Sequence, residues 1–323
     1  MISSPQFVKK HLDLVIVDDT IKPWRIIARY ANYELKSYSL HSLFHEPYVF
    51  AEVDLDYPSE TMTRYIKIVG SCNGLVCIYF WDLVDTFYIW NPSTRETRAL
   101  SAFEEKHSRG ISFGFGYDPS NDDYKVVRVD SVGDRLEVEV YSLRKDSWRR
   151  IGDFPHIVLG EGKVLNGSIL WAATNPIINS FSITALDLSE ETYMEIPQPN
   201  YESEIEHLFV IASRGRLCIV CEDAYYVDLW AMNEYGIKES WTKLVSMLYL
   251  PEQWPFQNPE PLWCLKDGVT LVNINGEFGI YDNIEQTFKF PLIHDAVPFC
   301  QADIYIESLV SPNAFMVPAD LNH

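Results

Sequence analysis

Cys218 and Cys221 form a CxxC, the spacing in this chain that most directly suggests chemistry. Such a pair ligates zinc when a second pair stands at matching spacing, and it performs redox work where its surroundings lower the thiol pKa. Cys264 and Cys300 are isolated, however, and the CxxC lies in an apolar run typical of a β-strand. Because side chains alternate along a strand, we expect Cys218 and Cys221 to point to opposite faces as buried, structural thiols.

Paired carboxylates are the second possible chemistry, since two acids held about 5–9.5 Å apart in a cleft can hydrolyse a glycosidic bond. Acidic clusters occur at Asp54 and Asp56, Asp122 and Asp123, Glu190 and Glu191, Glu202, Glu204 and Glu206, and Glu222 and Asp223. Sequence neighbours in loops rarely form such a cleft, so we predict solvated turns. The alternative is an acidic face that steers a basic partner.

Other motifs point away from catalysis. His41 and His45 have the i, i+4 spacing of metal ligands but lie outside any convincing helical pattern. The Gly-Phe-Gly within Phe113–Tyr117 lacks the spacing of a phosphate loop and is followed by no helix, so a crowded or bulged strand is expected. HExxH and kinase motifs do not occur. We therefore predict no catalytic residue, no metal and no cofactor.

Composition narrows the class of protein. The 323 residues include 26 Lys+Arg and 46 Asp+Glu, which gives a net charge of −20 and argues against a nucleic-acid binder. With 47% hydrophobic residues the chain is expected to fold. It shows no secretory signal and no apolar run long enough for a membrane span. Six sparse cysteines fit reduced thiols, so we expect a cytoplasmic or nuclear location.

The predicted strands, which must position the residues discussed above, follow a sequence repeat. Short β-branched and aromatic runs bounded by turn residues recur along the chain, and only Pro5–Leu12 looks weakly helical. An acid or amide, then Thr or Ser, then a large side chain recurs every 45 to 50 residues. The Thr or Ser markers of these five units are Thr97, Ser147, Thr192, Ser240 and Thr287.

Each unit has the size of one β-propeller blade. Hairpin turns are expected at Asn73-Gly74, Asn166-Gly167, Arg214-Gly215 and Asp267-Gly268. Strands from both termini, Asp13–Leu40 and Ala302–Leu309, would combine into a sixth blade that closes the ring and hides its edges. We therefore predict an all-β fold, a single propeller of about six blades with a short N-terminal helical segment; the alternative, a large β-sandwich, does not explain the regular spacing.

Aromatic residues in the expected loops are candidate contacts for a partner, because Trp and Tyr are common interface anchors. The candidate partner-binding residues are Trp81, Asp82, Tyr225, Tyr226, Trp254 and Phe256. Local packing is the competing explanation for each of these side chains.

Several segments resemble a known family. They are SCNGLVCI (71–78), YIWNPSTRETRALS (88–101), FGFGYDPSNDDYKVVRV (113–129), VYSLRKDSWRRI (140–151), LNGSILWAA (165–173) and IYIESLVS (304–311). In this order they resemble the plant F-box-associated interaction domain, found in S-locus F-box and F-box/kelch-like proteins. The resemblance implies a kelch-like propeller over residues 13–323, preceded by only the C-terminal end of an F-box in residues 1–12.

The resemblance also implies a function without intrinsic catalysis. Such domains hold a target protein for ubiquitination by an SCF-type cullin ligase, and S-locus relatives recognise basic ribonucleases, which would suit a charge of −20. Binding of the Skp-type adaptor and cullin would require the F-box helices missing from residues 1–12, so poor adaptor binding is expected for this chain alone. Two alternatives stay open: a propeller that binds or hydrolyses glycans in its axial channel, and a truncated relative that engages nothing.

Overall fold

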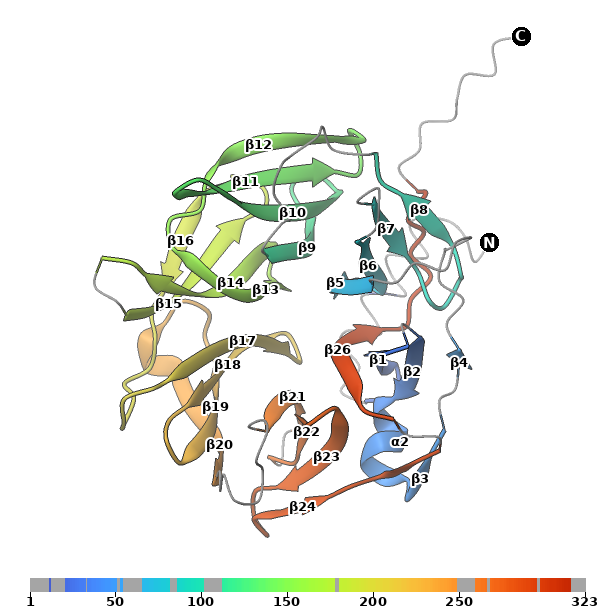
Figure 1. Cartoon of the computed structure of the whole chain (residues 1–323), viewed down its shortest axis with the longest axis vertical. Helices are drawn as coiled ribbons and strands as arrows, with labels where there is room; N and C mark the ends of the chain where they lie inside the picture. The colour runs from blue at the N-terminus through green and yellow to red at the C-terminus, as the bar shows by residue number, and fades with distance from the viewer. Residues whose placement is uncertain are drawn as a thin grey trace.

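Six four-stranded antiparallel sheets surround a central axis (Figure 1). The computed structural model describes residues 12, 21–32, 34–50, 53–54, 66–81, 86–101, 112–177, 180–248, 259–265, 268–294 and 297–314. Each sheet is one blade whose first strand lies nearest the axis. The expected all-β, six-bladed propeller is therefore confirmed.

Five blades are continuous in sequence. Blade I contains β5 (Ile66–Cys72), β6 (Leu75–Phe80), β7 (Thr86–Trp90) and β8 (Thr97–Ala99). Blade II contains β9 (Ser112–Asp118), β10 (Asp123–Val132), β11 (Arg135–Ser142) and β12 (Ser147–Asp153). Blade III contains β13 (Ile157–Leu165), β14 (Ser168–Asn175), β15 (Ser180–Asp187) and β16 (Tyr193–Ile196). Blade IV contains β17 (His207–Ser213), β18 (Arg216–Glu222), β19 (Tyr226–Met232) and β20 (Trp241–Leu248). Blade V contains β21 (Glu260–Cys264), β22 (Thr270–Ile274), β23 (Glu277–Asp282) and β24 (Thr287–Lys289).

Blade VI closes the ring with strands from both ends of the chain, as the sequence predicts. Its order is β26 (Phe299–Ile306), β1 (Trp24–Tyr30), β2 (Leu35–Ser39) and β4 (Val53–Asp54). The amide of Gln301 on β26 then bonds the backbone of Ile68 on β5, accepting from its N–H at 3.0 Å and donating to its carbonyl at 2.7 Å. One side chain therefore continues the ladder from blade VI into blade I.

The recurring marker, an acid or amide followed by Thr or Ser, lies at the hairpin between the third and fourth strands of a blade, and the geometry of that hairpin explains it. Asp187 begins this hairpin in blade III, and its carboxylate accepts the backbone N–H groups of Ser189 and Glu190. Glu191 then adopts a φ of +55°, the left-handed conformation that reverses the chain. The same pair of roles falls to Asn91 and Arg95 in blade I and to Asp282 and Gln286 in blade V.

The hairpin between the first and second strands uses a different turn. Both central residues have positive φ at Asn73-Gly74, Asn166-Gly167 and Arg214-Gly215, which matches a type I′ turn and confirms these three predictions. Gly268 also has positive φ, whereas Asp267 lies outside the described residues.

Strand direction alternates within each blade, so the connections divide between two faces of the ring. The first-to-second and third-to-fourth connections open on one face, which we call the short-turn face. The second-to-third connections and the links between successive blades open on the opposite, long-loop face. The link from blade III to blade IV, residues 197–206, is an example.

The core lies in the seams between blades. Cys221 packs in the seam between blades III and IV, whereas Cys218 packs in the seam between blades IV and V. The prediction that these thiols point to opposite faces as buried residues is confirmed. Gly114 and Gly116 on β9 are also crowded, since an added Cβ would lie 2.6 Å from Ile169 and 2.8 Å from Leu188.

The helices are few in the part of the chain that the structure describes. α2 (Leu40–His45) begins after Ser39, whose side chain accepts the N–H of Ser42. The expectation that His41 and His45 lie outside a helix is wrong: both are on α2, with ring centroids 4.8 Å apart. A helix of six residues is too short to produce a periodic hydrophobic pattern.

The remaining elements are small. η1 (Lys238–Ser240) precedes β20, and β3 (Tyr48–Val49) pairs in parallel with β25 (Leu292–Ile293). Leu12 is helical, while the rest of the predicted N-terminal helix lies outside the described residues. No helix within the described ranges has the length and apolar character needed to cross a bilayer.

Candidate functional site

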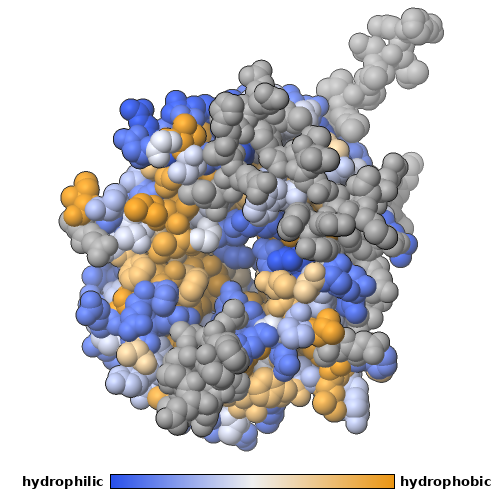
Figure 2. All heavy atoms as spheres, in the orientation of Figure 1, coloured by the Kyte–Doolittle hydropathy of each residue, from blue (hydrophilic) through white to orange (hydrophobic). Residues whose placement is uncertain are grey.

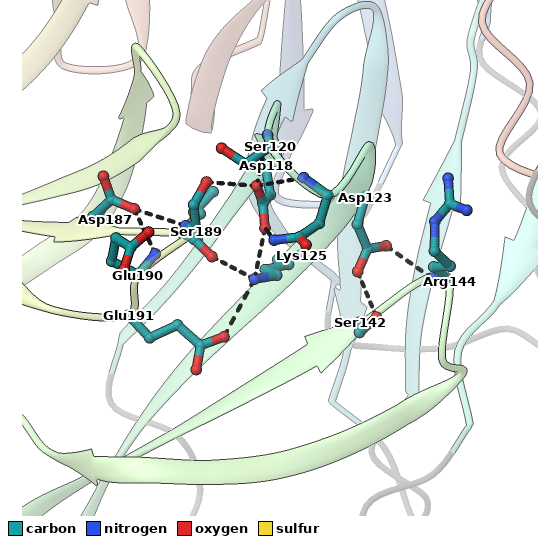
Figure 3. A network of polar contacts seen from close by, with 12 residues as sticks. Asp118, Ser120, Asp123, Lys125, Ser142, Arg144, Asp187, Ser189, Glu190 and Glu191 are labelled. Atoms are coloured by element: carbon teal, nitrogen blue, oxygen red, sulfur yellow. Dashed lines mark hydrogen bonds and ion pairs between the residues drawn. The ribbon is translucent and has the colours of Figure 1, made fainter.

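The short-turn face uses its charged residues to join blades. At the boundary of blades II and III, Asp118 accepts hydrogen bonds from Ser189 and Asn121 and lies 2.9 Å from the ammonium of Lys125 (Figure 3). Lys125 also contacts Glu191, at 3.2 Å. Burial raises the pKa of Asp118, but the hydrogen bonds from Ser189, Lys125 and Asn121 outweigh it and hold the pKa at about 2.

Besides Glu191, which pairs with Lys125 and Arg149 against the prediction of a solvated turn, two further acids predicted to be solvated belong to such structural contacts. Asp123 is buried and accepts the Ser142 hydroxyl and, at 2.8 Å, the backbone N–H of Arg144. Glu222 is also buried, on β18. For these two residues the prediction of a solvated turn is wrong, because a carboxylate that satisfies nearby donors replaces lost water.

The axis of the ring holds a cavity of about 970 Å³. Ion pairs cross it: Lys163 on blade III lies 2.9 Å from Asp303 on the opposite blade VI, and Glu161 pairs with Lys67 on blade I. Burial lowers the pKa of Lys163, but Asp303, Glu260 and Glu161 together hold it above its ordinary value. The carboxylates Glu161 and Asp303 are thus engaged by lysines inside the channel.

The long-loop face carries an apolar surface over the seam between blades III and IV. We call it the seam patch; its residues are Ile157, Leu159, Phe181, Tyr201, Ile205 and Phe209, the last of which is turned away from the seam and lines the axial cavity. Leu159, Phe181, Tyr201 and Ile205 are partly buried against the core of the seam. Ile157 at the start of β13 is 51% exposed, and Phe209 near the start of β17 is 39% exposed. Figure 2 shows apolar residues gathered over β13–β15 and β17, beside the central opening.

An acidic ridge borders this patch; we define it as Glu202, Glu204, Glu206 and Asp223. Its first three members alternate with Tyr201, Ser203 and Ile205 in the link between blades III and IV. The Ser203 hydroxyl donates to Asp223 at 2.5 Å, which ties that link to the β18–β19 turn of blade IV.

Asp223 also organises the turn that exposes two predicted contact residues. Its carboxylate accepts the backbone N–H groups of Tyr225 and Tyr226 at 2.8 and 2.7 Å. Burial raises the pKa of Asp223, yet these hydrogen bonds and the one from Ser203 lower it overall. The ridge therefore includes a carboxylate held in its charged form.

The structure brings together some of the predicted partner-binding residues and separates others. Tyr225 and Tyr226 are 65% and 44% exposed, beside the acidic ridge. Trp81 is 37% exposed at the end of β6, also on the long-loop face, but blade I lies opposite blade IV. Asp82, Trp254 and Phe256 lie outside the described residues.

Sequence reasoning missed Ile157 and Phe209. Phe209 stands between Leu208 and Val210, which point into the seam between blades III and IV, so strand alternation turns it away from that seam. This alternation is the signal in the sequence from which the exposure of Phe209 could have been predicted. Across the described part of the chain, no group of three or more His, Cys, Asp or Glu side chains could hold a metal ion.

A closed propeller whose buried charges bind one another, and whose long-loop face exposes an apolar surface rimmed by acids, is the architecture of an interaction module. Comparison with known proteins identifies its family. Residues 26–289 match the F-box associated β-propeller domain, and the chain belongs to that family.

Individual relatives are consistent with this family, and a solved structure is consistent with the propeller fold. The chain is 30% identical to an F-box/kelch-repeat protein of Arabidopsis thaliana, over 97% of this chain and 88% of the relative. It is 28% identical to F-box protein CPR1 of the same plant, over 96% of this chain and 81% of that protein. TolB from Acinetobacter baumannii has a similar fold, with a TM-score of 0.54 at 11% identity, over 93% of this chain and 71% of TolB. That last likeness concerns the fold alone.

Proposed function

We propose that this chain is the substrate-recognition module of a plant SCF-type ubiquitin ligase. The observation that carries the proposal is membership of the F-box associated propeller family, combined with an exposed apolar and acidic surface on one face of the ring. The chain would hold a target protein close to the ubiquitin-transfer machinery and raise the effective concentration of its lysines. The chemistry would occur on other subunits.

The path of the chain supports this arrangement. β1 begins on the short-turn face, where Trp24 pairs with Ile306 at the end of β26 and the Glu307 N–H donates to the Pro23 carbonyl at 2.9 Å. The chain therefore enters β1 from that face. We propose that residues 1–12 are the end of an F-box and residues 13–323 the target-binding domain. Adaptor and cullin would attach on the short-turn side, through complete F-box helices, and leave the long-loop face open.

The target class follows from charge. A net charge of −20 favours a basic protein and speeds its association, and ribonucleases of the S-locus type are one such target. The six cysteines are all free, which supports the reducing cytoplasm or nucleus as the place of action.

The test is a fusion of this chain to a complete F-box, expressed in plant cells and analysed by quantitative mass spectrometry. We expect the Skp-type adaptor and at least one further protein to co-purify, and the level of that protein to rise when the proteasome is inhibited. The unfused chain should recover the same protein with little adaptor. A folded fusion that binds the adaptor but recovers and depletes no other protein would contradict the proposal.

A further inference from the structure

We propose that the seam patch and the acidic ridge together bind one segment of the target, in which large apolar side chains alternate with Lys or Arg. This inference rests on the proposed function and assigns its binding surface and ligand chemistry. It rests on apolar exposure, on the charge of the ridge, and on the way the two surfaces are joined.

The apolar half offers side chains that a partner can cover. Ile157 and Phe209 come from the inner strands of adjacent blades, and both are substantially exposed. Leu159 and Phe181 of the same patch are partly buried against the core of the seam. Burying such a surface is favourable in proportion to its apolar area, and the blades hold it in place before the partner arrives.

The acidic half selects the charge of the partner. Glu204 and Glu206 are exposed, and neither forms an ion pair with another described residue. The cation that contacts the ridge is Lys243, whose ammonium lies 2.8 Å from both Glu202 and Asp228. Because Lys243 is already shared by two carboxylates, the ridge keeps a net negative charge.

The two halves meet in one segment of chain, the link between blades III and IV. Tyr201 and Ile205 belong to the patch, and the acids Glu202, Glu204 and Glu206 stand beside them in residues 201–206. A partner that covers these apolar side chains also meets the acids. A second copy of this chain is disfavoured as the occupant, since it would bring acid against acid.

The experiment measures binding of labelled 12-residue peptides to the full chain by fluorescence anisotropy. The probe alternates Lys with Leu and Phe; one control replaces every Lys by Glu, and another replaces every Leu and Phe by Ser. We expect binding of the probe, weakening by at least tenfold with either control, and a decrease in affinity between 50 and 300 mM salt.

Variants of the chain localise the binding. Glu204→Lys with Glu206→Lys should weaken probe binding at least tenfold, and so should Ile157→Ser with Phe209→Ser. The matched control, Glu190→Lys with Glu285→Lys, makes the same change in net charge at exposed acids on the short-turn face and should alter affinity less than twofold. Circular dichroism and thermal melts establish that each variant is folded.

Other outcomes overturn the inference. Equal losses from the ridge and control variants would mean nonspecific attraction to an acidic protein, and absence of probe binding would reject the ligand chemistry. A failure of the proposed function can be distinguished from a failure of this inference. If the F-box fusion with Glu204→Lys and Glu206→Lys still depletes its target, this surface is wrong but the function stands; if the unmodified fusion depletes nothing, the function fails.

Discussion

The two faces of the ring use similar residues for opposite purposes. On the short-turn face, Asp187 accepts two backbone N–H groups of its own hairpin, and Glu191 pairs with Lys125 of the neighbouring blade. On the long-loop face, Glu204 and Glu206 are exposed beside Ile205. Asp187 and Glu191 therefore stabilise a turn and a seam, whereas Glu204 and Glu206 remain available to solvent or a partner, although Asp223 on the same face also stabilises its own turn.

This difference separates stability from recognition. The short-turn face also holds the segment that follows β26, because Asn91 donates to the carbonyls of Ser308 and Val310 at 3.1 and 2.7 Å. Closure of the ring thus depends on that face. On the long-loop face we expect exposed residues to be replaceable without disturbing the blades, as surface connections generally are.

The largest effect should come from Gly74→Ala. Gly74 has a φ of +83°, and an added Cβ would lie 2.5 Å from the Ser308 Cβ and 2.7 Å from the Ile306 carbonyl oxygen. Backbone strain and overpacking together should lower the free energy of unfolding by about 4 kcal/mol, measured by urea denaturation.

Gly215→Ala is the matched control. Gly215 occupies the same turn position in blade IV, with a φ of +70°, but an added Cβ would meet nothing within 4 Å. The expected loss is only about 1–2 kcal/mol, from the backbone conformation alone. Equal losses in the two variants would show that contact with the closing segment contributes little.

Asn91→Ala should cost about 3 kcal/mol. The side chain is fully buried and serves four partners, so its removal leaves the Ser308 and Val310 carbonyls without a donor as well as weakening the turn. Asp282→Ala removes the same kind of turn acceptor in blade V, where the two N–H donors belong to the exposed residues Ile284 and Glu285, and should cost about 1 kcal/mol. Urea midpoints measure both; a larger loss for Asp282 would argue against a role of Asn91 in closure.

Asp118→Asn should show a loss that depends on pH. The folded-state pKa of Asp118, about 2, lies below its usual 3.8, so the charged carboxylate stabilises the fold above the unfolded-state value. The variant should be less stable by about 2 kcal/mol at pH 7, and the difference should shrink as pH falls through 4 toward 2. Unfolding curves at pH 7, 5, 4 and 3 test this; a difference independent of pH would mean that packing, not charge, explains the loss.

The fold could be predicted from sequence because its turns have strict chemical requirements. Asn73-Gly74 and Asn166-Gly167 supply the positive φ values of two-residue hairpins, and the acid or amide of four of the five markers stands in or beside a left-handed position; the exception is Glu239, in η1. The spacing of these turns gave the blade size. By contrast, α2 is too short to produce a pattern, and the burial of Asp123 depends on Ser142, at the end of β11, and on Arg144, in the turn that follows.

The candidate site was less predictable for a related reason. Loop aromatics such as Tyr225 are recognisable from sequence, and their part in binding remains a prediction. The seam patch depends on which strand ends meet across two blades, since Ile157 and Phe209 are ordinary strand residues until the ring brings them to one face. Sequence spacing does not contain that juxtaposition.

The smallest effect on stability should come from the long-loop face itself. Ile177, in the β14–β15 connection, is 90% exposed, so Ile177→Ser should change the free energy of unfolding by less than about 0.5 kcal/mol. Ile183→Ser is its contrast, because Ile183 is fully buried on the adjoining β15 and the same exchange there buries a hydroxyl and leaves a cavity, at a cost of about 3 kcal/mol or more. Urea denaturation of both variants compares surface and seam within one blade. A large loss of unfolding free energy for Ile177→Ser would mean that the long-loop face also stabilises the ring. The two faces would then not differ in their contribution to stability.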